Sequence, residues 1–217
     1  MITPYKGTFR VSQTYKNPRS TGPHQGFDMV GTPVKGIYSP VYGTVERAGW
    51  ENPLLQGQGF GLYVRIRVGK TAYRMYFGHL SEIYVRTGQT VKPGALLGIE
   101  GSTGRSTGSH LHWEIRNGTA KRSYMSIAGY SNVPNACGLY TGDQGISTLG
   151  IKTLRTGQNQ YPYCLYNATL QAMLGLAQDG IYGSKTAAAV RDFQLRHGLE
   201  PDGLAGPATK AALMQEV

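Results

Sequence analysis

The residues best suited to chemistry are four histidines and one aspartate in the first half of the chain: His24, Asp28, His79, His110 and His112. The Pro and Gly residues of PHQGFDMVGTP favour a turn and a strand edge around His24 and Asp28. In SHLHWEIR, strand alternation places His110 and His112 on one face, next to the loop-like GSTGRSTGS. Two histidines and one aspartate provide three ligands for a catalytic zinc with a fourth position for water, and further histidines can carry protons.

Each of these residues also has a simpler interpretation. A single histidine is more often a surface residue or a hydrogen-bonded core residue, and a His-x-His pair alone is only sometimes a metal site. His79, between MYFG and LSE, is expected at a strand end, and His197, in LRHGLE, near a helix end. The combination of His24, Asp28 and the His-x-His pair in one half of the chain favours the metal site.

Short β-rich runs punctuated by Gly and Pro extend from Tyr38 to Arg116. LYVRIRV and HLHWEIR alternate with a period of two, which is typical of strands with one buried face. We therefore expect this half of the chain to be mainly antiparallel sheet. The runs are SPVYGTVERAG, GLYVRIRVG, TAYRMYFGHL, EIYVRTGQTV, GALLGIEG and SHLHWEIR.

The C-terminal part contains an internal repeat. DGIYGSKTAAAV, beginning at Asp179, recurs 23 residues later as DGLAGPATKAAL, beginning at Asp202. Asp-Gly permits a positive φ, and Pro207 suits the first position of a helix, so each copy predicts a tight turn followed by a helix. With LYNATLQAMLGL as a third helix, the pattern predicts a three-helix bundle. Its buried faces are expected to comprise Ala189, Val190, Phe193, Leu195, Ala208, Ala211, Ala212 and Met214.

The predicted fold class is α+β multidomain, with a mainly antiparallel β domain and a small three-helix bundle. We place the first domain at residues 1–135, with its core at 20–120, a Gly-, Asn-, Ser- and Thr-rich linker at 136–155, and the helical domain at 156–217. Charge supports this division, because residues 1–135 carry 16 Lys and Arg against 6 Asp and Glu, whereas residues 136–217 carry 6 of each. The net charge of +10 therefore belongs to the first domain.

A basic domain favours polyanionic partners, which include nucleic acid, anionic membranes and anionic cell-wall polymers. The Lys and Arg residues are scattered among strand-like runs, so we expect no nucleic-acid partner. The apolar runs are far shorter than the ~20 residues of a membrane span, which predicts no membrane insertion, and MITPYKGTFRVSQTY lacks the apolar core of a secretory signal. Cys137 and Cys164 cannot form a disulfide framework, and either clamp the linker to the helical domain or stay as thiols.

Three separated motifs, in the same order, resemble the lysostaphin-type zinc endopeptidases, which cut the stem peptides and cross-bridges of peptidoglycan. The motifs are His24-x-Gly26-x-Asp28, GQGFGLYVRIR, and GHLSEIYVRTGQTVKPGALLGIEGSTGRSTGSHLHWEIR, and together they cover roughly residues 20–120. The C-terminal repeat is similar to the three-helix peptidoglycan-binding domain of many cell-wall hydrolases. Two positions depart from the family pattern: Phe77 stands where Tyr is frequent, and Ser109 replaces a common Pro.

The resemblance implies that His24, Asp28 and His112 are zinc ligands and that His79 and His110 are the unligated catalytic pair. Zinc would supply a nucleophile at neutral pH and polarise the scissile carbonyl in metal-assisted amide hydrolysis. His79 and His110 would position or deprotonate the attacking water and stabilise the oxyanion, with the division of these roles left open. The implied partners are peptidoglycan and, through the basic charge, anionic wall polymers.

A catalytic domain followed by a wall-binding domain, without a secretory signal, resembles a bacteriophage endolysin. Such a protein is expected to be a monomer and to stay in the host cytoplasm until a membrane pore releases it to the wall. The alternatives are a secreted bacterial autolysin of the same chemistry and a catalytically inactive, zinc-free regulatory member of the fold. VRTGQTVKPGALLGIEG also resembles a biotinyl or lipoyl carrier hairpin, but it lacks the modifiable Lys context, and a carrier needs no His and Asp set.

Overall fold

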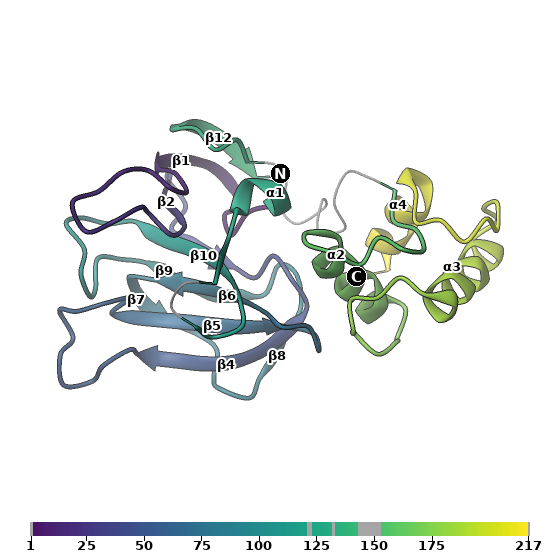
Figure 1. The fold of residues 1–217 in the computed structure, drawn as a ribbon, viewed down its shortest axis with the longest axis horizontal. Coiled ribbons are helices and arrows are strands. Elements are labelled where there is room, and N and C mark those ends of the chain that lie inside the picture. Colours follow the sequence, from purple (N-terminus) through teal and green to yellow (C-terminus); the bar gives the residue numbers. More distant parts are fainter. Residues whose placement is uncertain (1, 121–122, 132, 143–152, 217) are drawn as a thin grey trace. The chain divides into compact units, whose positions relative to one another are not determined.

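A computed structural model describes residues 2–120, 123–131, 133–142 and 153–216. The chain divides into two compact units (Figure 1): Met1–Val68 with Ala72–Gly145, and Gly69–Thr71 with Ile146–Val217. Strands dominate the first unit and helices dominate the second, which confirms the predicted α+β class. Among the described residues, no helix has the length and apolar content that a membrane crossing demands.

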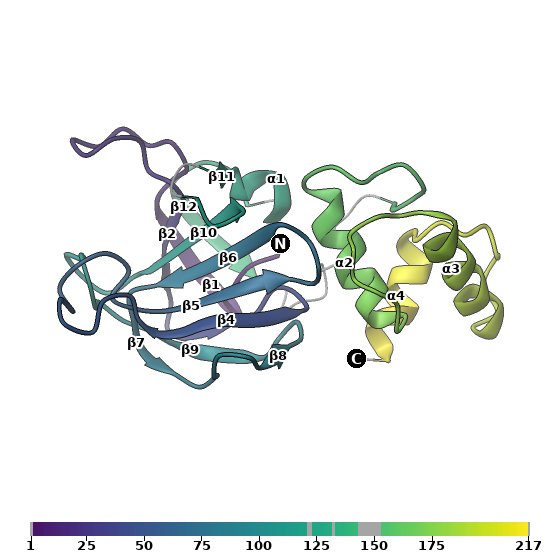
Figure 2. The ribbon, with the colours of Figure 1, turned by 60° about the horizontal axis from the view of Figure 1, so that its bottom comes forward.

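The large sheet of the first unit is antiparallel, and within the described residues its strands follow the order β12-β1-β2-β10-β6-β5-β4-β8, with β11 on β10. Figure 2 shows β4, β5 and β6 side by side. The strands of this sheet are β1 (Gly7–Gln13), β2 (Phe27–Gly31), β4 (Gly43–Trp50), β5 (Leu62–Val68), β6 (Tyr73–Gly78), β8 (Thr90–Val91), β10 (Leu111–Asn117), β11 (Tyr124–Met125) and β12 (Gly138–Gly142). A second antiparallel sheet has the order β3-β9-β7, and a short helix follows β11. These elements are β3 (Gly36–Tyr38), β7 (Leu80–Ile83), β9 (Leu96–Glu100) and α1 (Ile127–Ser131).

Alternation along the strands separates a core face of the large sheet from a polar face. Trp113, Phe77 and Val64 are directly opposite one another on β10, β6 and β5, and all three are fully buried. His112 and Glu114, on either side of Trp113, therefore lie on the other face. Because the register is set by burial of the apolar face, a shift of one residue would turn His112 into the core.

Two expectations for the first domain are wrong in part. EIYVRTGQTV is not one strand, because β7 ends at Ile83 and β8 comprises only Thr90–Val91. The predicted linker, residues 136–155, begins with a strand of the first unit, since β12 pairs with β1 along its whole length. The sequence of β12 shows little apolar alternation because backbone hydrogen bonds at a sheet edge hold it, rather than burial of its side chains. Residues 143–152 of that linker lie outside the described residues.

The second unit contains the three predicted helices, α2 (Tyr163–Met173), α3 (Ser184–Arg196) and α4 (Pro207–Gln215). Pro207 is the first residue of α4, where its missing N–H costs no hydrogen bond. Gly180 and Gly203 have φ angles of 78° and 73°, so both Asp-Gly turns use the left-handed region that the repeat predicts. Both cysteines are thiols, Cys137 exposed and Cys164 buried.

The buried faces of these helices differ from the predicted set. Val190 and Phe193 are buried as expected, but Leu195 is 63% exposed. In α4 the buried face is displaced by one position from the prediction. Its exposed residues include Ala208 and Ala211, and its buried residues are Thr209 and Leu213. The remaining predicted residues, Ala189, Ala212 and Met214, are half-buried.

The displacement has its cause in a polar network that each repeat builds around a buried glutamine. Gln194 Nε2 donates to Asp202 Oδ1 at 2.8 Å and to Thr209 Oγ1 at 3.0 Å. Gln194 Oε1 accepts from the N–H of Gly203 at 2.9 Å, and Gln171 makes the equivalent bonds in the first copy. Since a buried amide needs its partners, α4 turns Thr209 inward in place of the neighbouring alanine.

A buried carboxylate, Glu100 at the end of β9, joins several segments of the first unit. Tyr5 Oη and the N–H of Gly31 donate to Glu100 Oε2 at 2.5 and 2.8 Å. Lys35 Nζ and Ser109 Oγ donate to its Oε1 at 2.6 and 2.7 Å. Burial alone would raise the pKa of Glu100, but these donors together hold it below its ordinary value. The carboxylate is therefore charged in the folded protein.

Glu100→Gln is expected to lower the free energy of unfolding at pH 7 by ~2 kcal/mol, because an amide cannot accept from all four donors and loses the charge opposite Lys35. The pKa of Glu100 is lowered by folding, so the carboxylate stabilises the fold above its unfolded pKa of ~4.3, and this contribution is lost as the pH falls below that value. The variant should therefore lose less stability than the wild type on acidification. Denaturant unfolding at pH 7 and pH 3.5 measures this, and an equal loss in both proteins would contradict it.

Candidate metal centre

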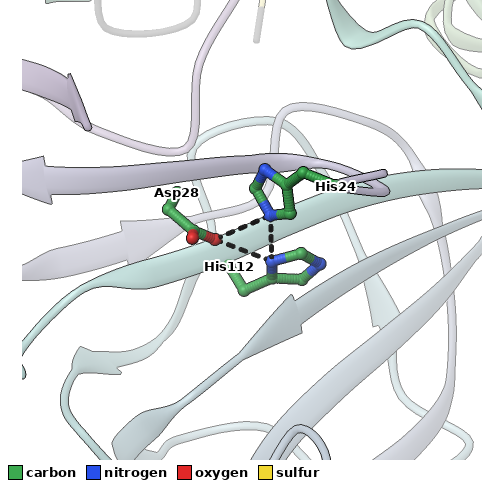
Figure 3. A group of neighbouring side chains, drawn as sticks. All are labelled: His24, Asp28 and His112. Carbon is green, nitrogen blue, oxygen red and sulfur yellow. Dashed lines mark hydrogen bonds and ion pairs between the residues drawn. The ribbon is translucent and has the colours of Figure 1, made fainter. Parts of the chain in front are cut away.

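Three side chains from two distant segments converge at one point on the polar face of the large sheet (Figure 3). Asp28 and His112 are directly opposite each other on β2 and β10, and His24 lies just before β2. His112 Nδ1 is 2.8 Å from Asp28 Oδ1, and His24 Nε2 is 3.1 Å from each of these two atoms. All three residues are buried, with no more than 8% of any of the three side chains exposed.

In their neutral rings, the two facing histidine nitrogens offer lone pairs to a metal ion. His24 Nδ1 donates to the carbonyl of Thr14 at 3.0 Å, which leaves Nε2 unprotonated in the neutral ring. His112 Nε2 is 3.2 Å from Glu114 Oε2, and in the neutral ring this acceptor places the proton on Nε2 and leaves Nδ1 unprotonated. Each histidine is thus oriented by an acceptor on its far side.

The carboxylate of Asp28 completes the donor set. Its Oδ2 accepts from Arg19 Nη2 at 2.5 Å, so Oδ1 is the oxygen that faces the histidines. Ligand atoms at ~2.0–2.1 Å from a tetrahedral zinc lie ~3.3 Å from one another. The separations of 2.8 to 3.1 Å between these atoms are close to that spacing. Two imidazole nitrogens and one carboxylate oxygen therefore fit a catalytic zinc with one open position.

The pKa values of the cluster depend on hydrogen bonds between its own members. Burial alone would raise the pKa of Asp28, but hydrogen bonds from His112 and His24 hold it well below its usual range. Burial favours the neutral form of His112, yet its contacts with Asp28 and Glu114 raise its pKa to about 9. Burial lowers the pKa of His24 despite the nearby carboxylate. Asp28 therefore stays charged, and a metal ion that binds His112 Nδ1 would displace the proton that this raised pKa keeps on the ring.

His79 flanks this cluster from the junction between β6 and β7. Its φ of 63° lies in the left-handed region, which is uncommon for a residue other than glycine. Its backbone N–H donates to Phe60 O and its Nδ1 donates to Thr103 O, both at 2.8 Å. Burial, followed by the charges of His112 and His110, lowers the pKa of His79 to about 4. The ring is therefore neutral at pH 7, with Nε2 unprotonated.

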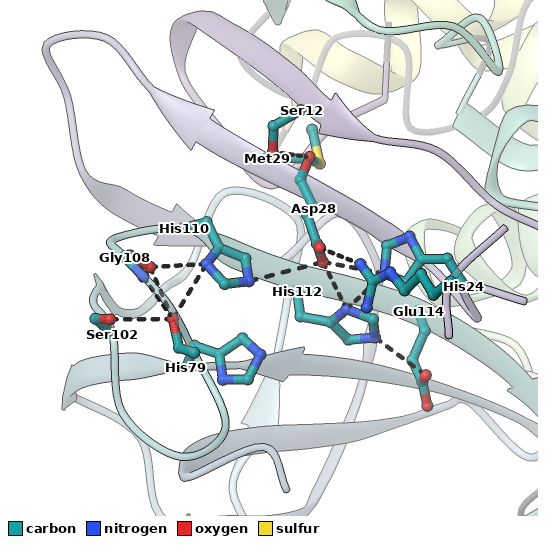
Figure 4. A network of polar contacts seen from close by, with 12 residues as sticks. Ser12, His24, Asp28, Met29, His79, Ser102, Gly108, His110, His112 and Glu114 are labelled. Carbon is teal, nitrogen blue, oxygen red and sulfur yellow. Dashed lines mark hydrogen bonds and ion pairs between the residues drawn. The ribbon is translucent and has the colours of Figure 1, made fainter. Parts of the chain in front are cut away.

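His110 lies beside His79, and their ring centroids are 4.7 Å apart. His110 Nδ1 donates to Gly108 O at 2.8 Å, and its Nε2 points toward the cluster, 3.8 Å from Asp28 Oδ1 (Figure 4). Ser109, which replaces the common Pro, donates to the buried carboxylate at the end of β9. The structure thus brings all five predicted site residues together, three in the buried cluster and two beside it.

A close approach of two glycines positions the loop beside His79. Gly61 and Gly104 have φ angles of 64° and 72°, and a Cβ on Gly61 would lie 2.3 Å from the nitrogen of Gly104. This contact brings Thr103 against the start of β7, where its Oγ1 donates to the carbonyl of Leu80 at 2.8 Å. The carbonyl of Thr103 is thereby held in place to accept the Nδ1 proton of His79.

Glu114 and Arg116 also lie at the site, although neither was predicted from the sequence. Arg116 Nε donates to Glu114 Oε1, and the other carboxylate oxygen faces His112. The alternation that pairs the histidines could have revealed both residues, because positions 112, 114 and 116 share one face of a strand. Phe77, which departs from the family pattern, is buried on the core face opposite Trp113 and does not reach the site.

Comparison with known proteins gives matches in both units. Residues 22–124 match the family described as "Peptidase family M23", and residues 165–213 match the "Putative peptidoglycan binding domain". The chain is 36% identical over 143 residues to peptidoglycan DD-endopeptidase ShyA of Vibrio cholerae, covering 60% of this chain and 31% of that protein. It is 35% identical over 121 residues to glycyl-glycine endopeptidase ALE-1 of Staphylococcus capitis, covering 51% and 31%.

The structure of lysostaphin from Staphylococcus simulans superposes with a TM-score of 0.50 and 25% identity, covering 59% of this chain and 50% of that one. The chain spans about a third of the length of the two curated relatives, so the similarity concerns domains rather than whole proteins. The match to residues 22–124 includes all five candidate site residues. The match to residues 165–213 extends from α2 through α3 to α4. The chain therefore combines a domain of peptidase family M23 at residues 22–124 with a peptidoglycan-binding domain at residues 165–213.

Proposed function

We propose that this chain is a zinc-dependent endopeptidase that hydrolyses peptide bonds of bacterial peptidoglycan. The observation that carries the proposal is the convergence of His24 Nε2, Asp28 Oδ1 and His112 Nδ1, with His79 and His110 beside them. The match of the same residues to peptidase family M23 supports it.

His24, Asp28 and His112 would hold the zinc, which when bound supplies Lewis acidity for the scissile carbonyl and for a water molecule. The two flanking histidines, His79 and His110, would transfer protons during the hydrolysis. Their Nδ1 atoms donate to the carbonyls of Thr103 and Gly108, so each Nε2 carries a lone pair. Such a nitrogen can accept a proton from the attacking water and return it to the leaving amine.

The second unit would serve as a wall anchor. Its match to a peptidoglycan-binding family supports this role, and an anchor raises the local concentration of an enzyme at an insoluble substrate. Residues 136–217 are formally neutral, so this binding should depend little on salt. The basic first unit would add a salt-sensitive attraction to anionic wall polymers.

The biological role we favour is that of a phage endolysin, a monomer that stays in the host cytoplasm until it is released to the wall. The order of a catalytic domain before a wall-binding domain supports it. A secreted autolysin would use the same chemistry and the same two domains. A catalytically inactive regulator is less well supported, because all three ligand positions are filled and their donor atoms converge.

Similarity to the relatives does not identify which peptide bond this chain would cleave. ShyA is named as a DD-endopeptidase and ALE-1 as a glycyl-glycine endopeptidase, and this chain is about equally similar to both. The substrate bond would therefore lie either between stem peptides or within a glycine bridge.

Digestion of purified cell walls tests the proposed function. The full chain is expected to release fragments with new peptide amino termini, to lose this activity on chelation and to regain it with added zinc. Mass spectrometry of the fragments identifies the bond. A chain truncated after Gly142 keeps β12 paired with β1, so it should cut soluble fragments at the same rate but intact walls more slowly at high salt.

Different outcomes would contradict different parts of the proposal. New reducing sugar ends in place of peptide amino termini would show glycan cleavage. Full activity after exhaustive chelation would exclude the zinc mechanism. Equal rates of the two chains on intact walls at high salt would remove the anchoring role of the helical unit.

A further inference from the structure

Arginines gather on the polar face of the large sheet beyond the metal centre. Directly opposite residues of antiparallel strands share a face, so the register defines rows on the same face as His112. The first row, from β10 to β4, comprises Glu114, Tyr76, Arg65 and Arg47. The next row, further from His112, comprises Arg116, Arg74, Arg67 and Thr44. We call the five arginines of these rows the arginine floor.

The arginine floor has an excess of positive charge. Four of its guanidinium groups, those of Arg47, Arg65, Arg74 and Arg116, have three described carboxylates nearby, and those are Glu46, Glu51 and Glu114. Arg65 and Arg74 share Glu46, with contacts of 3.2 and 3.0 Å. Glu51 is already an acceptor for the N–H of Phe60 at 2.6 Å. Among the described residues, these four arginines therefore outnumber the three carboxylates by one.

The arginines of the floor differ in solvent exposure, and therefore in whether a ligand can contact their guanidinium groups. The Arg116 side chain is 10% exposed and lies over the Tyr76 ring at 4.3 Å, so its role is to hold Glu114. The Arg65 and Arg74 side chains are 26% and 17% exposed, and Arg47 is an exposed residue. A guanidinium has five N–H donors, more than a shared carboxylate can accept. Arg65 and Arg47, which are directly opposite each other, are therefore best placed to bind an anion.

We propose that the arginine floor, through Arg65 and Arg47, binds a carboxylate of the substrate, and that the substrate is an acidic stem peptide rather than an uncharged glycine bridge. The inference rests on the proposed endopeptidase function and specifies its substrate class. Arginine binds a carboxylate through two parallel N–H bonds, and a glycine backbone offers no charged acceptor for them.

The distance from the metal centre suits such a contact. Arg65 lies two strands from β10 and one row beyond His112. With strands ~4.8 Å apart and ~3.4 Å between residues along a strand, their Cα atoms are separated by ~12 Å. An extended peptide covers that distance in about three to four residues. A carboxylate within one stem peptide of the scissile bond can therefore reach the floor.

Three soluble peptides test the inference on the full, zinc-loaded chain: a cross-linked stem peptide with one free carboxylate, the same peptide with that group amidated, and oligoglycine. The wild type is expected to cleave the acid with a kcat/KM about 10-fold above that of the amide. Arg65→Gln should raise KM for the acid about 10-fold at unchanged kcat, and should change KM for the amide less than about twofold.

Two further variants complete the test. Arg47→Gln, at an exposed position, should act on the acid in the same direction, which keeps the inference testable if Arg65→Gln fails to fold. Arg10→Gln is the matched control, because Arg10 is exposed on β1, outside the floor, and loses the same charge. Its kinetic constants for acid and amide should equal those of the wild type.

Equal cleavage of acid and amide by the wild type, or preferred cleavage of oligoglycine, would overturn the inference and leave the endopeptidase function intact. Failure to cleave any of the three peptides would overturn the proposed function and this inference with it. If acid and amide are cleaved equally while a glycerol phosphate polymer inhibits the wild type but not Arg65→Gln, the floor binds anionic wall polymers, and the inference is overturned.

Discussion

His112→Ala is expected to lose bound zinc and hydrolytic activity together. Only His24 and Asp28 would remain as ligands, and a site with two protein ligands holds zinc poorly. The variant also removes the partner that lies 2.8 Å from Asp28 Oδ1 and leaves this buried carboxylate with a weaker set of donors. Zinc content should fall from about one ion per chain to near zero after dialysis, with turnover at background.

Elemental analysis of the dialysed protein and hydrolysis of a soluble peptidoglycan fragment measure the two losses. His197→Ala is the matched control, because His197 lies in the helical unit and contacts Glu216. Thermal unfolding with excess chelator compares the fold of both variants with that of the metal-free wild type. A His112→Ala protein that keeps one zinc per chain and near-normal turnover would show that the ligand assignment is wrong.

His79→Ala is expected to do the reverse, retaining zinc while kcat falls by ~10²–10⁴. His79 is outside the ligand set, and its Nδ1 is already bonded to Thr103 O. Its Nε2 is therefore the atom that remains for proton transfer or oxyanion stabilisation. Alanine supplies no such atom, but its backbone N–H can still donate to Phe60 O, so the loop should keep its place. KM should change much less than kcat.

Zinc stoichiometry and steady-state kinetics on the same preparation check this prediction. Thr103→Ser is a suitable control, because the backbone carbonyl that accepts from His79 and the hydroxyl that donates to Leu80 are both kept. Its kcat should stay close to that of the wild type. Metal loss in His79→Ala would make His79 a ligand, and an unchanged kcat would remove it from the mechanism.

The fold class could be predicted from the sequence because local patterns carry it. The alternation of LYVRIRV and HLHWEIR follows directly from a strand with one buried face, and β5 and β10 occupy these segments. The Asp-Gly turns and Pro207 act through their own backbone conformations, so they mark the start of a helix without help from the rest of the chain. Both features need no long-range partner.

Predictions failed where distant partners hold an element in place. β12 forms because its backbone pairs with β1, more than a hundred residues earlier, and its own side chains carry little apolar pattern. The buried face of α4 is set by Gln194, which requires Thr209 as a partner. Neither requirement is visible within the segment itself.

The sequence by itself determined which side chains are available at the site and that His110 and His112 share a strand face. Only the tertiary structure decided that the two histidines occupy different places at the site. The register of β10 against β2 sets His112 opposite Asp28, whereas His110 lies beside His79. It also decided which nitrogen of each histidine faces the centre. That choice depends on acceptors supplied by other residues, such as the carbonyl of Thr14, and an acceptor acts only at hydrogen-bond distance, which folding alone creates.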